Sequence, residues 1–364
     1  MAKKHVLIDI RPLLSNRVSG VTVYLEGLVK NLALDQSFQY SLFCNSAKRK
    51  NFTELEKLIP IYYTRYPNKI FNLVLAKFNF PKIDKLISKK VDIFISADIR
   101  PTALSKNVKK IQVLHDFSWQ KYPQYFSRKT NLWFKLIQPQ KEINESDAIV
   151  TVSKAIKREC GTDRKVRVIT PFILRHTKAA EKVKPEAKTL FYIGTLEPRK
   201  NLEKAIKAFK IVHKADPKTK FIIAGTRDNS VFSMQNDTSK NSQSNETGIK
   251  YIGNISEKTK NKYLQKSRCL VYLSHYEGFG LPVAEAITND TPCIISRDPA
   301  LKETAGTAGL SVNENSVRDI VEGMKKILYD DAGYKELKQN CQKQSKKWNN
   351  KQTLQQWVKL LKEF

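Results

Sequence analysis

Residues 268–285 read RCLVYLSHYEGFGLPVAE, and they pass from an apolar run through a glycine-rich turn into a segment that begins with Leu-Pro. The apolar run has the length and composition of a buried strand. Proline is favoured at the start of a helix, because the N–H group that it lacks would have no partner there. Strand, tight turn and helix in that order are typical of an α/β fold with a parallel sheet. We therefore expect an α/β protein with a parallel sheet and a ligand site at this turn.

The same turn has the chemistry of a binding site. Backbone amides at a helix start attract anions, and glycines let a ligand approach the backbone closely. The residues that would present these amides are Gly278, Phe279, Gly280 and Leu281. Glu277 precedes them and Glu285 lies about one turn into the helix, so amides would hold a phosphate while carboxylates hold sugar hydroxyls. The alternative is that these acids only complement the helix dipole.

A second segment, GTLEPRKNLEKAI at residues 194–206, suits the other end of such a ligand. Arg199 and Lys200 follow a predicted strand and precede a predicted helix. Two adjacent cations at the carboxyl end of a strand, beside a helix N-terminus, are well placed to bind a diphosphate. The alternative is a solvated basic turn in a lysine-rich protein. Both segments fall in one α/β unit, which favours a single nucleotide-diphosphate ligand.

Apolar runs alternate with helical segments twice along the chain, which predicts two domains. The first covers residues 1–174 and opens with the strand VLIDI. A polar, basic stretch without apolar periodicity, 175–188, is the predicted linker. The second domain covers 189–340, and 341–364 is a helix expected to cross back to the first domain. Residues 228–248 are rich in Ser and Asn and are predicted to form a mobile surface loop or a disordered insertion.

The composition is that of a globular chain with a strongly basic character. Hydrophobic residues make up 41% and charged residues 27% of the 364 residues, and the net charge is +30. No apolar run approaches the roughly 20 residues of a membrane span, and no secretory leader is visible. Five dispersed cysteines without a C-x-x-C pair indicate reduced thiols and a cytoplasmic protein. The positive charge predicts attraction to polyanions, although a lysine-rich composition explains it equally well.

The two site segments, with the Glu-x7-Glu spacing in HYEGFGLPVAEAITNDTPCIIS, resemble the retaining glycosyltransferases of family 4. Further segments extend the resemblance over most of the chain: VLIDIRPLLSNRVSGVTVYLEGLVKNL, VLHDFSWQKYP and IVTVSKAIKREC. Members of this family have the GT-B fold, in which two Rossmann-like, doubly wound domains face each other across a cleft. The resemblance implies a hexosyltransferase that uses a nucleotide-diphosphate sugar, GDP-mannose or a UDP-hexose, and a saccharide acceptor in cell-surface polysaccharide or glycoconjugate assembly.

The resemblance also implies roles for the residues around the donor. Glu285 matches the ribose-binding glutamate of the family, and Glu277 matches the glutamate that contacts the donor sugar, which we treat as a catalytic residue. Arg199, Lys200 and the amides of residues 278–281 would bind the donor diphosphate. No metal or other cofactor is expected, because fixed cations and a helix start would stabilise the leaving diphosphate. Consistently, no Asp-x-Asp triplet occurs, and the five histidines show no zinc spacing.

In the first domain the resemblance implies three further site residues. Gly20 would let a loop approach the diphosphate, and His115 matches the active-site histidine near the transferred sugar. Asp116 would either orient this histidine or cap the next loop. The chain departs from the family at Thr195, where many members carry an arginine, so diphosphate binding would depend on the two cations named above.

Residues 69–90, KIFNLVLAKFNFPKIDKLISKK, combine six lysines and one aspartate with Ile, Leu, Val and Phe. A cationic amphipathic surface of this kind suits peripheral binding to the anionic cytoplasmic face of a membrane that carries a lipid-linked acceptor. The alternative is a core-facing helix with a solvated lysine face.

Two other classes of function compete with this interpretation. The charge of +30 would suit a nucleic-acid-binding protein, but no helix-turn-helix, zinc or RNA-recognition signature occurs, so no nucleic-acid partner is expected. Another GT-B enzyme, a sugar-nucleotide epimerase or a phosphorylase, is the nearer alternative. A non-catalytic partner subunit is disfavoured because all the expected site residues are present.

Overall fold

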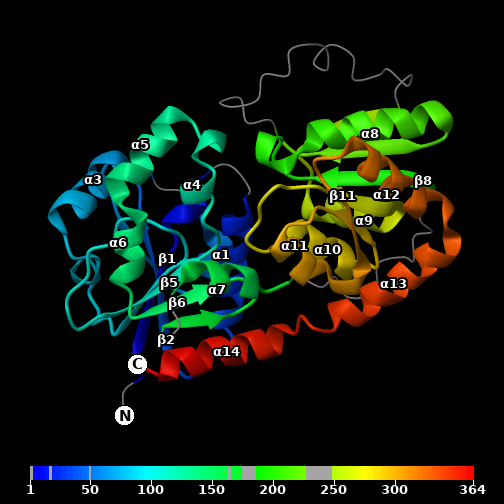
Figure 1. Cartoon of the computed structure of the whole chain (residues 1–364). Coiled ribbons are helices and arrows are strands. Elements are labelled where there is room, and N and C mark those ends of the chain that lie inside the picture. Colours follow the sequence, from blue (N-terminus) through cyan, green and yellow to red (C-terminus); the bar gives the residue numbers. More distant parts are fainter. Residues whose placement is uncertain (1–2, 16–18, 49–50, 162–164, 174–185, 227–247) are drawn as a thin grey trace. The chain divides into compact units, whose positions relative to one another are not determined.

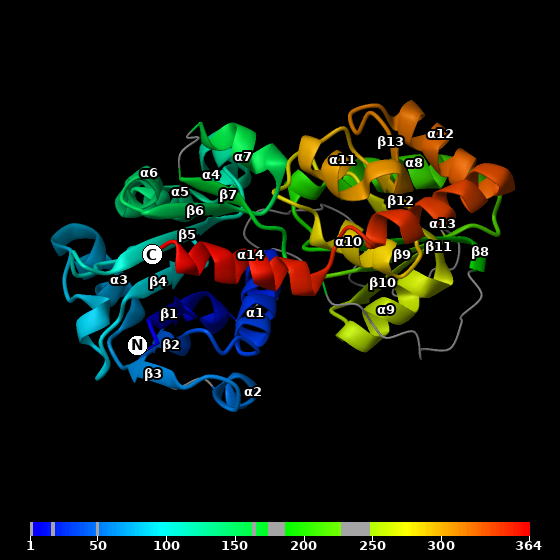
Figure 2. The same cartoon turned by 90° about the horizontal axis from the view of Figure 1, so that it is seen from below.

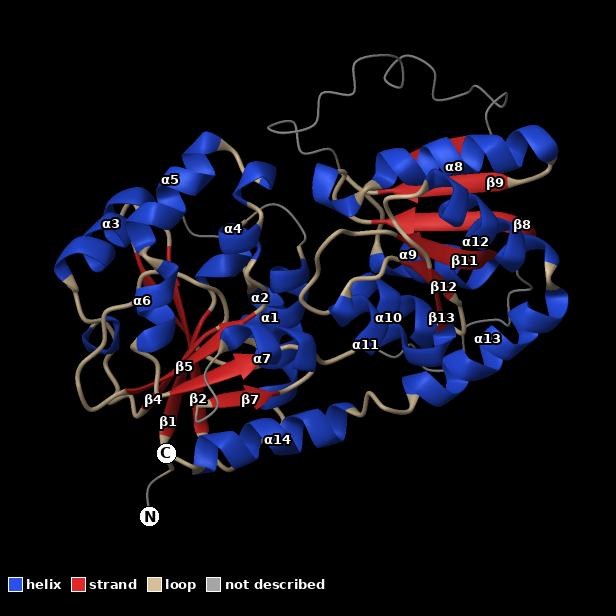
Figure 3. Cartoon of the chain, viewed as in Figure 1, coloured by secondary structure: helices blue, strands red, loops and turns tan. Residues whose placement is uncertain are grey.

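The computed structural model describes residues 3–15, 19–48, 51–161, 165–173, 186–226 and 248–364. The chain divides into two compact units. Unit 1 comprises Met1–Lys121, Arg128–Phe172 and Asn349–Phe364, and unit 2 comprises Tyr122–Ser127 and Ile173–Trp348. Each unit is a parallel sheet with helices packed around it (Figure 1, Figure 3).

Unit 1 is built on a seven-stranded sheet of order β3-β2-β1-β4-β5-β6-β7, in which every pair is parallel. Its strands are β1 (His5–Asp9), β2 (Gln39–Asn45), β3 (Ile61–Thr64), β4 (Ile93–Ser96), β5 (Lys109–Leu114), β6 (Ala148–Thr151) and β7 (Val166–Val168). Its helices are α1 (Gly20–Leu32), α2 (Thr53–Glu56), α3 (Asn68–Phe78), α4 (Ser118–Lys121), α5 (Arg128–Ile137), α6 (Pro139–Asn144), α7 (Lys154–Cys160) and α14 (Asn350–Lys362). The strand order reverses between β1 and β4.

Unit 2 repeats this plan with six parallel strands in the order β10-β9-β8-β11-β12-β13. The strands are β8 (Glu186–Ile193), β9 (Lys220–Ala224), β10 (Ile249–Gly253), β11 (Ser267–Tyr272), β12 (Cys293–Ile295) and β13 (Gly309–Ser311). The helices are α8 (Leu202–Ala215), α9 (Glu257–Lys266), α10 (Leu281–Thr288), α11 (Pro299–Ala305), α12 (Val317–Tyr329) and α13 (Asp331–Ser345). Here the order reverses between β8 and β11.

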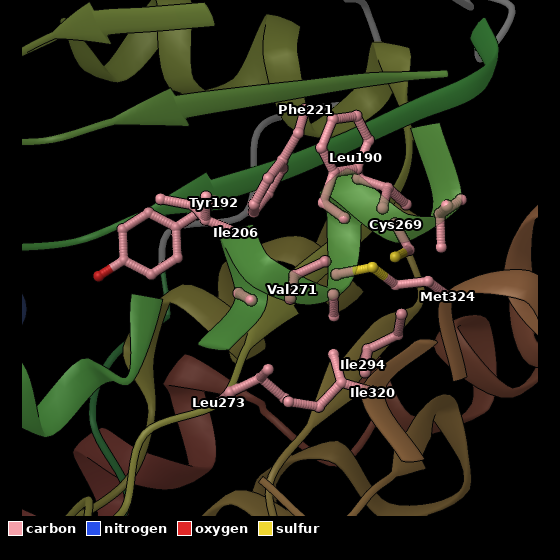
Figure 4. Close-up of a cluster of buried hydrophobic side chains, with 14 of the residues drawn as sticks. Leu190, Tyr192, Ile206, Phe221, Cys269, Val271, Leu273, Ile294, Ile320 and Met324 are labelled. Carbon is pink, nitrogen blue, oxygen red and sulfur yellow. The ribbon is translucent and has the colours of Figure 1, made fainter. Parts of the chain in front are cut away.

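Helices cover both faces of the unit 2 sheet. Leu190 and Tyr192 of β8 join a buried cluster with Ile206 of α8 and Met324 of α12 (Figure 4). Phe191, between them in sequence, faces the other way and stacks on Tyr263 of α9, with ring centroids 5.6 Å apart. A central parallel strand buries both faces, and this is why β8 is apolar at consecutive positions.

The structure confirms the predicted α/β fold with two doubly wound, Rossmann-like units. Most of the predicted linker, residues 175–185, lies outside the described residues, and 186–188 already belong to β8. The predicted surface loop 228–248 also lies outside the described residues, apart from Gly248.

The C-terminal segment predicted as one helix, 341–364, is interrupted. α13 ends at Ser345 in unit 2, and the Asn349 side chain then accepts hydrogen bonds from the amides of Lys351 and Gln352 to begin α14. An asparagine cap satisfies amides that a new helix would leave unpaired, so the chain starts a second helix at this point. α14 lies beside α1 within unit 1 (Figure 2). None of the described helices is long and apolar enough to cross a membrane.

Candidate active site

The predicted donor segments lie where the strand order of unit 2 reverses. In doubly wound sheets, ligands bind at the carboxyl ends of the two strands that flank this reversal. β8 leads into the short 3-10 helix Pro198–Lys200 and then into α8, while its neighbour β11 leads through the glycine turn into α10. The topology therefore brings together Lys200 and Glu277, which are 77 residues apart in sequence.

Lys200 is the buried cation of this site. Its side chain is only 9% exposed, and its Nζ donates to Oη of Tyr272 at 2.9 Å and to Oε1 of Glu277. Asn201 follows with a φ of 53°, and this left-handed residue ends the 3-10 turn and begins α8. An ammonium group has three N–H donors, and among the described residues Lys200 uses two of them, for Tyr272 and Glu277. The third N–H has no acceptor among the described residues.

Arg199 is held from both segments. Its Nη1 donates to the carbonyl of Tyr276 at 2.5 Å, and its Nη2 donates to Oε1 of Glu197 at 2.7 Å. Nη1 also lies 3.6 Å from Oε1 of Glu277, and the carbonyl of Arg199 accepts from the amide of His275 at 2.9 Å. These bonds tie the segment after β8 to the segment after β11, so the two cations are positioned before any ligand binds.

Glu277 is a buried carboxylate that stays charged. Burial alone would raise the pKa of this carboxyl, but the charges of Lys200 and Arg199 outweigh burial and lower the pKa to about 2. At neutral pH the group is therefore an acceptor only. A fixed carboxylate of this kind can bind sugar hydroxyls and stabilise positive charge that develops on a sugar ring.

The glycine turn and helix start take the predicted form. Gly280 has a φ of 86° and precedes α10, which begins at Leu281 with Pro282 in its first turn. The left-handed dihedral angle favours glycine, and a Cβ atom on Gly280 would lie 2.5 Å from Cδ2 of Leu301, so that side chain would have to shift. The amides of residues 278–281 stand at the helix start, where backbone N–H groups favour anions.

Asp298 is a site residue that sequence reasoning missed. Its Oδ2 accepts from the amide of Glu277 at 3.3 Å, and its Oδ1 accepts from the amide of Leu301 at 2.9 Å, which caps α11. Burial, with the nearby charge of Glu277, raises the pKa of Asp298 to about 6. The Asp-Pro pair at 298–299 is a helix-start signal that reveals the cap. Its contact with Glu277 depends on the pairing of β11 with β12, which no local signal reveals.

Glu285 lies on α10 and pairs with Lys260 on α9. The Nζ atom of Lys260 is 2.7 Å from Oε1 of Glu285 and 2.8 Å from the Glu257 carboxylate. Burial raises the pKa of Glu285, and the charge of Lys260 opposes this shift. Among the described residues no donor reaches Oε2 of Glu285, so this oxygen can still accept a hydrogen bond. Lys260 has no predicted role, because every lysine of SEKTKNKYLQK, 256–266, resembles a solvated helix face.

Two of the three remaining predicted residues lie at loop ends of unit 1. Gly20 is the first residue of α1 and follows the capping residue Ser19. His115 follows β5, and its Nε2 is 2.8 Å from the carbonyl oxygen of Ala97. Because a carbonyl only accepts, Nε2 carries the proton in this contact. The ring packs edge-on against Tyr24, with centroids 4.8 Å apart.

Asp116 makes the bonds of a capping residue. Its Oδ1 accepts from the amide of Ser118 at 2.8 Å and from the Ser118 hydroxyl at 2.6 Å. These contacts favour the capping alternative over orientation of His115, whose Nε2 meets a backbone carbonyl instead. Within the described ranges, no group of three or more His, Cys, Asp or Glu side chains is arranged to hold a metal ion.

Two family descriptions match the chain and together span residues 18–348. Residues 175–348 match "Glycosyl transferases group 1", and residues 18–174 match "Glycosyltransferase Family 4". The chain belongs to this family of glycosyltransferases, as the Glu-x7-Glu segment implied.

Individual relatives are similar over different lengths. The chain is 31% identical to O-antigen chain mannosyltransferase B of Escherichia coli over 145 residues, which cover 39% of this chain and 37% of that protein. The match to the serotype-specific mannosyltransferase WbdA of the same organism covers only 17% of that protein. An uncharacterized glycosyltransferase of Methanocaldococcus jannaschii is 26% identical and matches over 91% of both chains.

Solved structures of similar fold identify the architecture. A mutant of TarM from S. aureus, in complex with fondaparinux, alpha-GlcNAc-glycerol and UDP, superposes with a TM-score of 0.71 at 13% identity, over 98% of this chain and 99% of that one. HepE of Anabaena in complex with UDP-glucose gives 0.70 at 16% identity, over 99% and 100%. The chain has the GT-B fold that the sequence resemblance implied.

Proposed function

We propose that this protein is a retaining hexosyltransferase that moves a sugar from a nucleotide diphosphate to a saccharide acceptor. The buried contact between Lys200 and Glu277, with Arg199 beside it at the switch point of unit 2, carries the proposal. Cations suited to a diphosphate meet there with a charged carboxylate suited to a donor sugar. Glu285, on the helix that starts at the same turn, supplies a carboxylate oxygen for the ribose.

Charge development explains how these groups would act. Breaking the bond between sugar and diphosphate places negative charge on the phosphate and positive charge on the sugar ring. The third N–H of Lys200, the Arg199 guanidinium and the amides of residues 278–281 would stabilise the phosphate charge. Glu277 would hold sugar hydroxyls and support the positive charge, and His115 would contact the transferred sugar. Within unit 2, Lys200, Arg199 and Glu277 hold one another in place, so little reorganisation of these three side chains would accompany transfer.

We propose GDP-mannose or a UDP-hexose as the donor. Support for mannose comes from the names of the E. coli relatives, which are mannosyltransferases. Support for uridine comes from HepE, whose structure contains UDP-glucose. A thermal-shift screen with UDP-, GDP-, dTDP- and ADP-sugars separates the two, because only the true donor family stabilises the folded protein appreciably.

Transfer without a metal ion is part of the same proposal. Two side-chain cations and a helix start are grouped at the site, and the sequence contains no Asp-x-Asp triplet to bridge a metal to a diphosphate. Turnover after treatment with EDTA tests this: unchanged transfer is expected, and activity that returns only with added Mg²⁺ or Mn²⁺ would contradict it.

For the acceptor we propose a lipid-linked saccharide in cell-surface polysaccharide or glycoconjugate assembly, at the cytoplasmic face of a membrane. The O-antigen mannosyltransferase relative supports this class of acceptor. The exposed basic and apolar residues of α3, in unit 1, support peripheral binding of the enzyme to an anionic lipid surface.

A direct assay tests the activity. Purified protein is incubated with each sugar nucleotide, with and without a lipid-linked saccharide, and the new linkage is assigned by NMR. We expect nucleoside diphosphate release that requires acceptor and a product that keeps the anomeric configuration of the donor. Conversion of the sugar nucleotide without acceptor would indicate an epimerase, and dependence on inorganic phosphate would indicate a phosphorylase. Full transfer activity in Glu277→Ala would overturn the assignment of the site.

A further inference from the structure

Exposed apolar side chains gather on one part of unit 1. Ten large hydrophobic side chains of the described residues are exposed, and six of them belong to α3, its flanking residues and α5: Tyr66, Ile70, Leu73, Phe78, Phe80 and Leu132. α3 and α5 pack against each other and can be followed together in Figure 1. We call these two packed helices and their flanking residues, with the six exposed side chains, the α3–α5 surface.

The two sides of α3 have different roles. Phe71 and Leu75, one turn apart, are buried in the core of unit 1. Ile70 and Phe78 are exposed to 59% and 70%. Only two of the seven apolar residues of this helix are therefore buried by core packing. A helix that is apolar on the side away from the core needs another partner.

The charge of the α3–α5 surface has a single sign. No acidic residue occurs between Lys57 and Ile83 or between Phe117 and Lys141, so α3, α5 and their flanks carry none. Their exposed cations are Arg65, Lys69, Lys77, Arg128, Lys129 and Lys135. A second protein domain with an ordinary mixed surface would not match so uniform a charge. Nucleic acid would match the charge but would leave the aliphatic side chains without a partner.

We propose that the α3–α5 surface binds the headgroup and upper acyl region of an anionic phospholipid membrane. Phe78, Phe80, Ile70 and Leu132 would enter the interface, and the surrounding cations would contact the lipid phosphates. This inference extends the proposed function, because it places a transferase for lipid-linked acceptors on the membrane. The inference also defines the membrane-binding surface more closely, because it includes α5, which the sequence did not indicate.

Vesicle co-sedimentation tests the surface without any sugar nucleotide. The full-length protein is mixed with vesicles of phosphatidylcholine, alone or with phosphatidylglycerol. We expect binding to the acidic vesicles only, and a loss of roughly tenfold or more in partitioning for Ile70→Ser/Phe78→Ser and for Lys69→Glu/Lys77→Glu. Matched controls change equally exposed residues elsewhere: Leu34→Ser/Ile211→Ser and Lys210→Glu/Lys214→Glu. The controls are expected to bind acidic vesicles nearly as the parent protein does.

Several outcomes would overturn the inference. These are equal binding to neutral and acidic vesicles, binding to neither, or the same loss in the control variants. Binding of single-stranded RNA through the same residues, with no vesicle binding, would replace the membrane by a nucleic acid. All the changed side chains are exposed, so each variant is expected to fold. Thermal melting of each variant checks this.

The vesicle-binding test and the sugar-transfer test can fail independently of each other. If vesicle binding fails while sugar transfer to a detergent-solubilised acceptor persists, the surface is wrong and the transferase stands. If vesicle binding holds while no sugar nucleotide is turned over, the surface stands and the proposed function fails.

Discussion

The ammonium group of Lys260 lies 2.7 Å from Oε1 of Glu285, and the two residues come from different helices, α9 and α10. The same ammonium meets Glu257 at 2.8 Å. Lys260 and Glu285 are both largely buried, with side-chain exposures of 8% and 14%. We infer that Lys260 positions the Glu285 carboxylate and opposes the rise in its pKa that burial causes, so that in the proposed function Oε2 is presented to the ribose.

The first prediction is that Lys260→Met weakens donor binding in a pH-dependent way. Burial raises the pKa of Glu285, and without the opposing cation that pKa rises further, so more of the carboxyl is protonated near neutral pH. We expect the donor KM to rise by about tenfold at the acidic end of the working range and by less at the alkaline end, with little change in kcat. Initial-rate kinetics across pH measure both constants.

Lys207→Met is the control for this prediction. Lys207 pairs with Glu203 at 2.6 Å, but both side chains are exposed on α8, so kinetics are expected to stay unchanged. A KM increase in Lys260→Met that is the same at every pH would contradict the positioning role and indicate general damage to the site.

The second prediction concerns the buried pair of Lys200 and Glu277. Glu277→Gln removes the countercharge of the buried Lys200 ammonium and leaves it with neutral acceptors, and Lys200→Met leaves the carboxylate with Arg199 at 3.6 Å. Each single change is expected to cost about 3–5 kcal/mol in the free energy of unfolding, because it leaves a buried charge uncompensated. The double variant should recover part of that stability while transfer activity stays lost. Denaturant unfolding and donor turnover are the two measurements.

An exposed pair provides the comparison. Lys57 and Glu54 are 2.8 Å apart, with side-chain exposures of 64% and 82%, and breaking that solvent-screened pair should leave the free energy of unfolding almost unchanged. Additive losses in the Lys200 and Glu277 double variant would mean that the two residues do not act as a pair.

The third prediction is a pH dependence of stability from Asp298. Its pKa is raised to about 6 in the folded protein, against 3.8 ordinarily, mainly because the carboxyl is buried. Its favourable contribution is therefore complete below about pH 4 and is lost as the pH rises through about 6. Relative to Asp298→Asn, the parent protein should lose up to about 3 kcal/mol between these limits. Unfolding of both proteins at several pH values measures the difference.

Asp330→Asn is the matched control, because Asp330 also caps a helix, α13, through the amide of Gly333 at 2.9 Å. Asp330 is half-buried, and its described bonds include no contact with a buried glutamate like the one that Asp298 makes with Glu277. If the stability difference for Asp298→Asn were constant with pH, the carboxyl would not be titrating near 6 in the folded protein.

The parts of the site that sequence predicts are those set by local physical chemistry. A proline and two glycines determine the helix start at Leu281, and an apolar run followed by Arg199-Lys200 marks a strand end. Sequence does not reveal which strands are neighbours, so the contacts of Glu277 with Asp298 follow only from the order of β11 and β12. The role of Lys260 could not be predicted for a related reason: nothing in the local sequence distinguishes this buried lysine from the solvated lysines beside it.

The last prediction is that Gly280→Ala reduces activity more than its effect on stability would suggest. The substitution imposes a left-handed φ of 86° on alanine, which costs roughly 1–2 kcal/mol, and brings Cβ within 2.5 Å of Leu301. Gly253→Ala separates the two effects, because Gly253 has a φ of 66° but open space around its Cβ position. We expect Gly253→Ala to show only the backbone cost and normal donor kinetics. Gly280→Ala should also lose donor affinity, since relief of the contact shifts the amides of residues 278–281, and adding Leu301→Ala should restore part of that affinity. Equal kinetics in the two glycine variants would show that the turn at Gly280 does not position those amides for the donor.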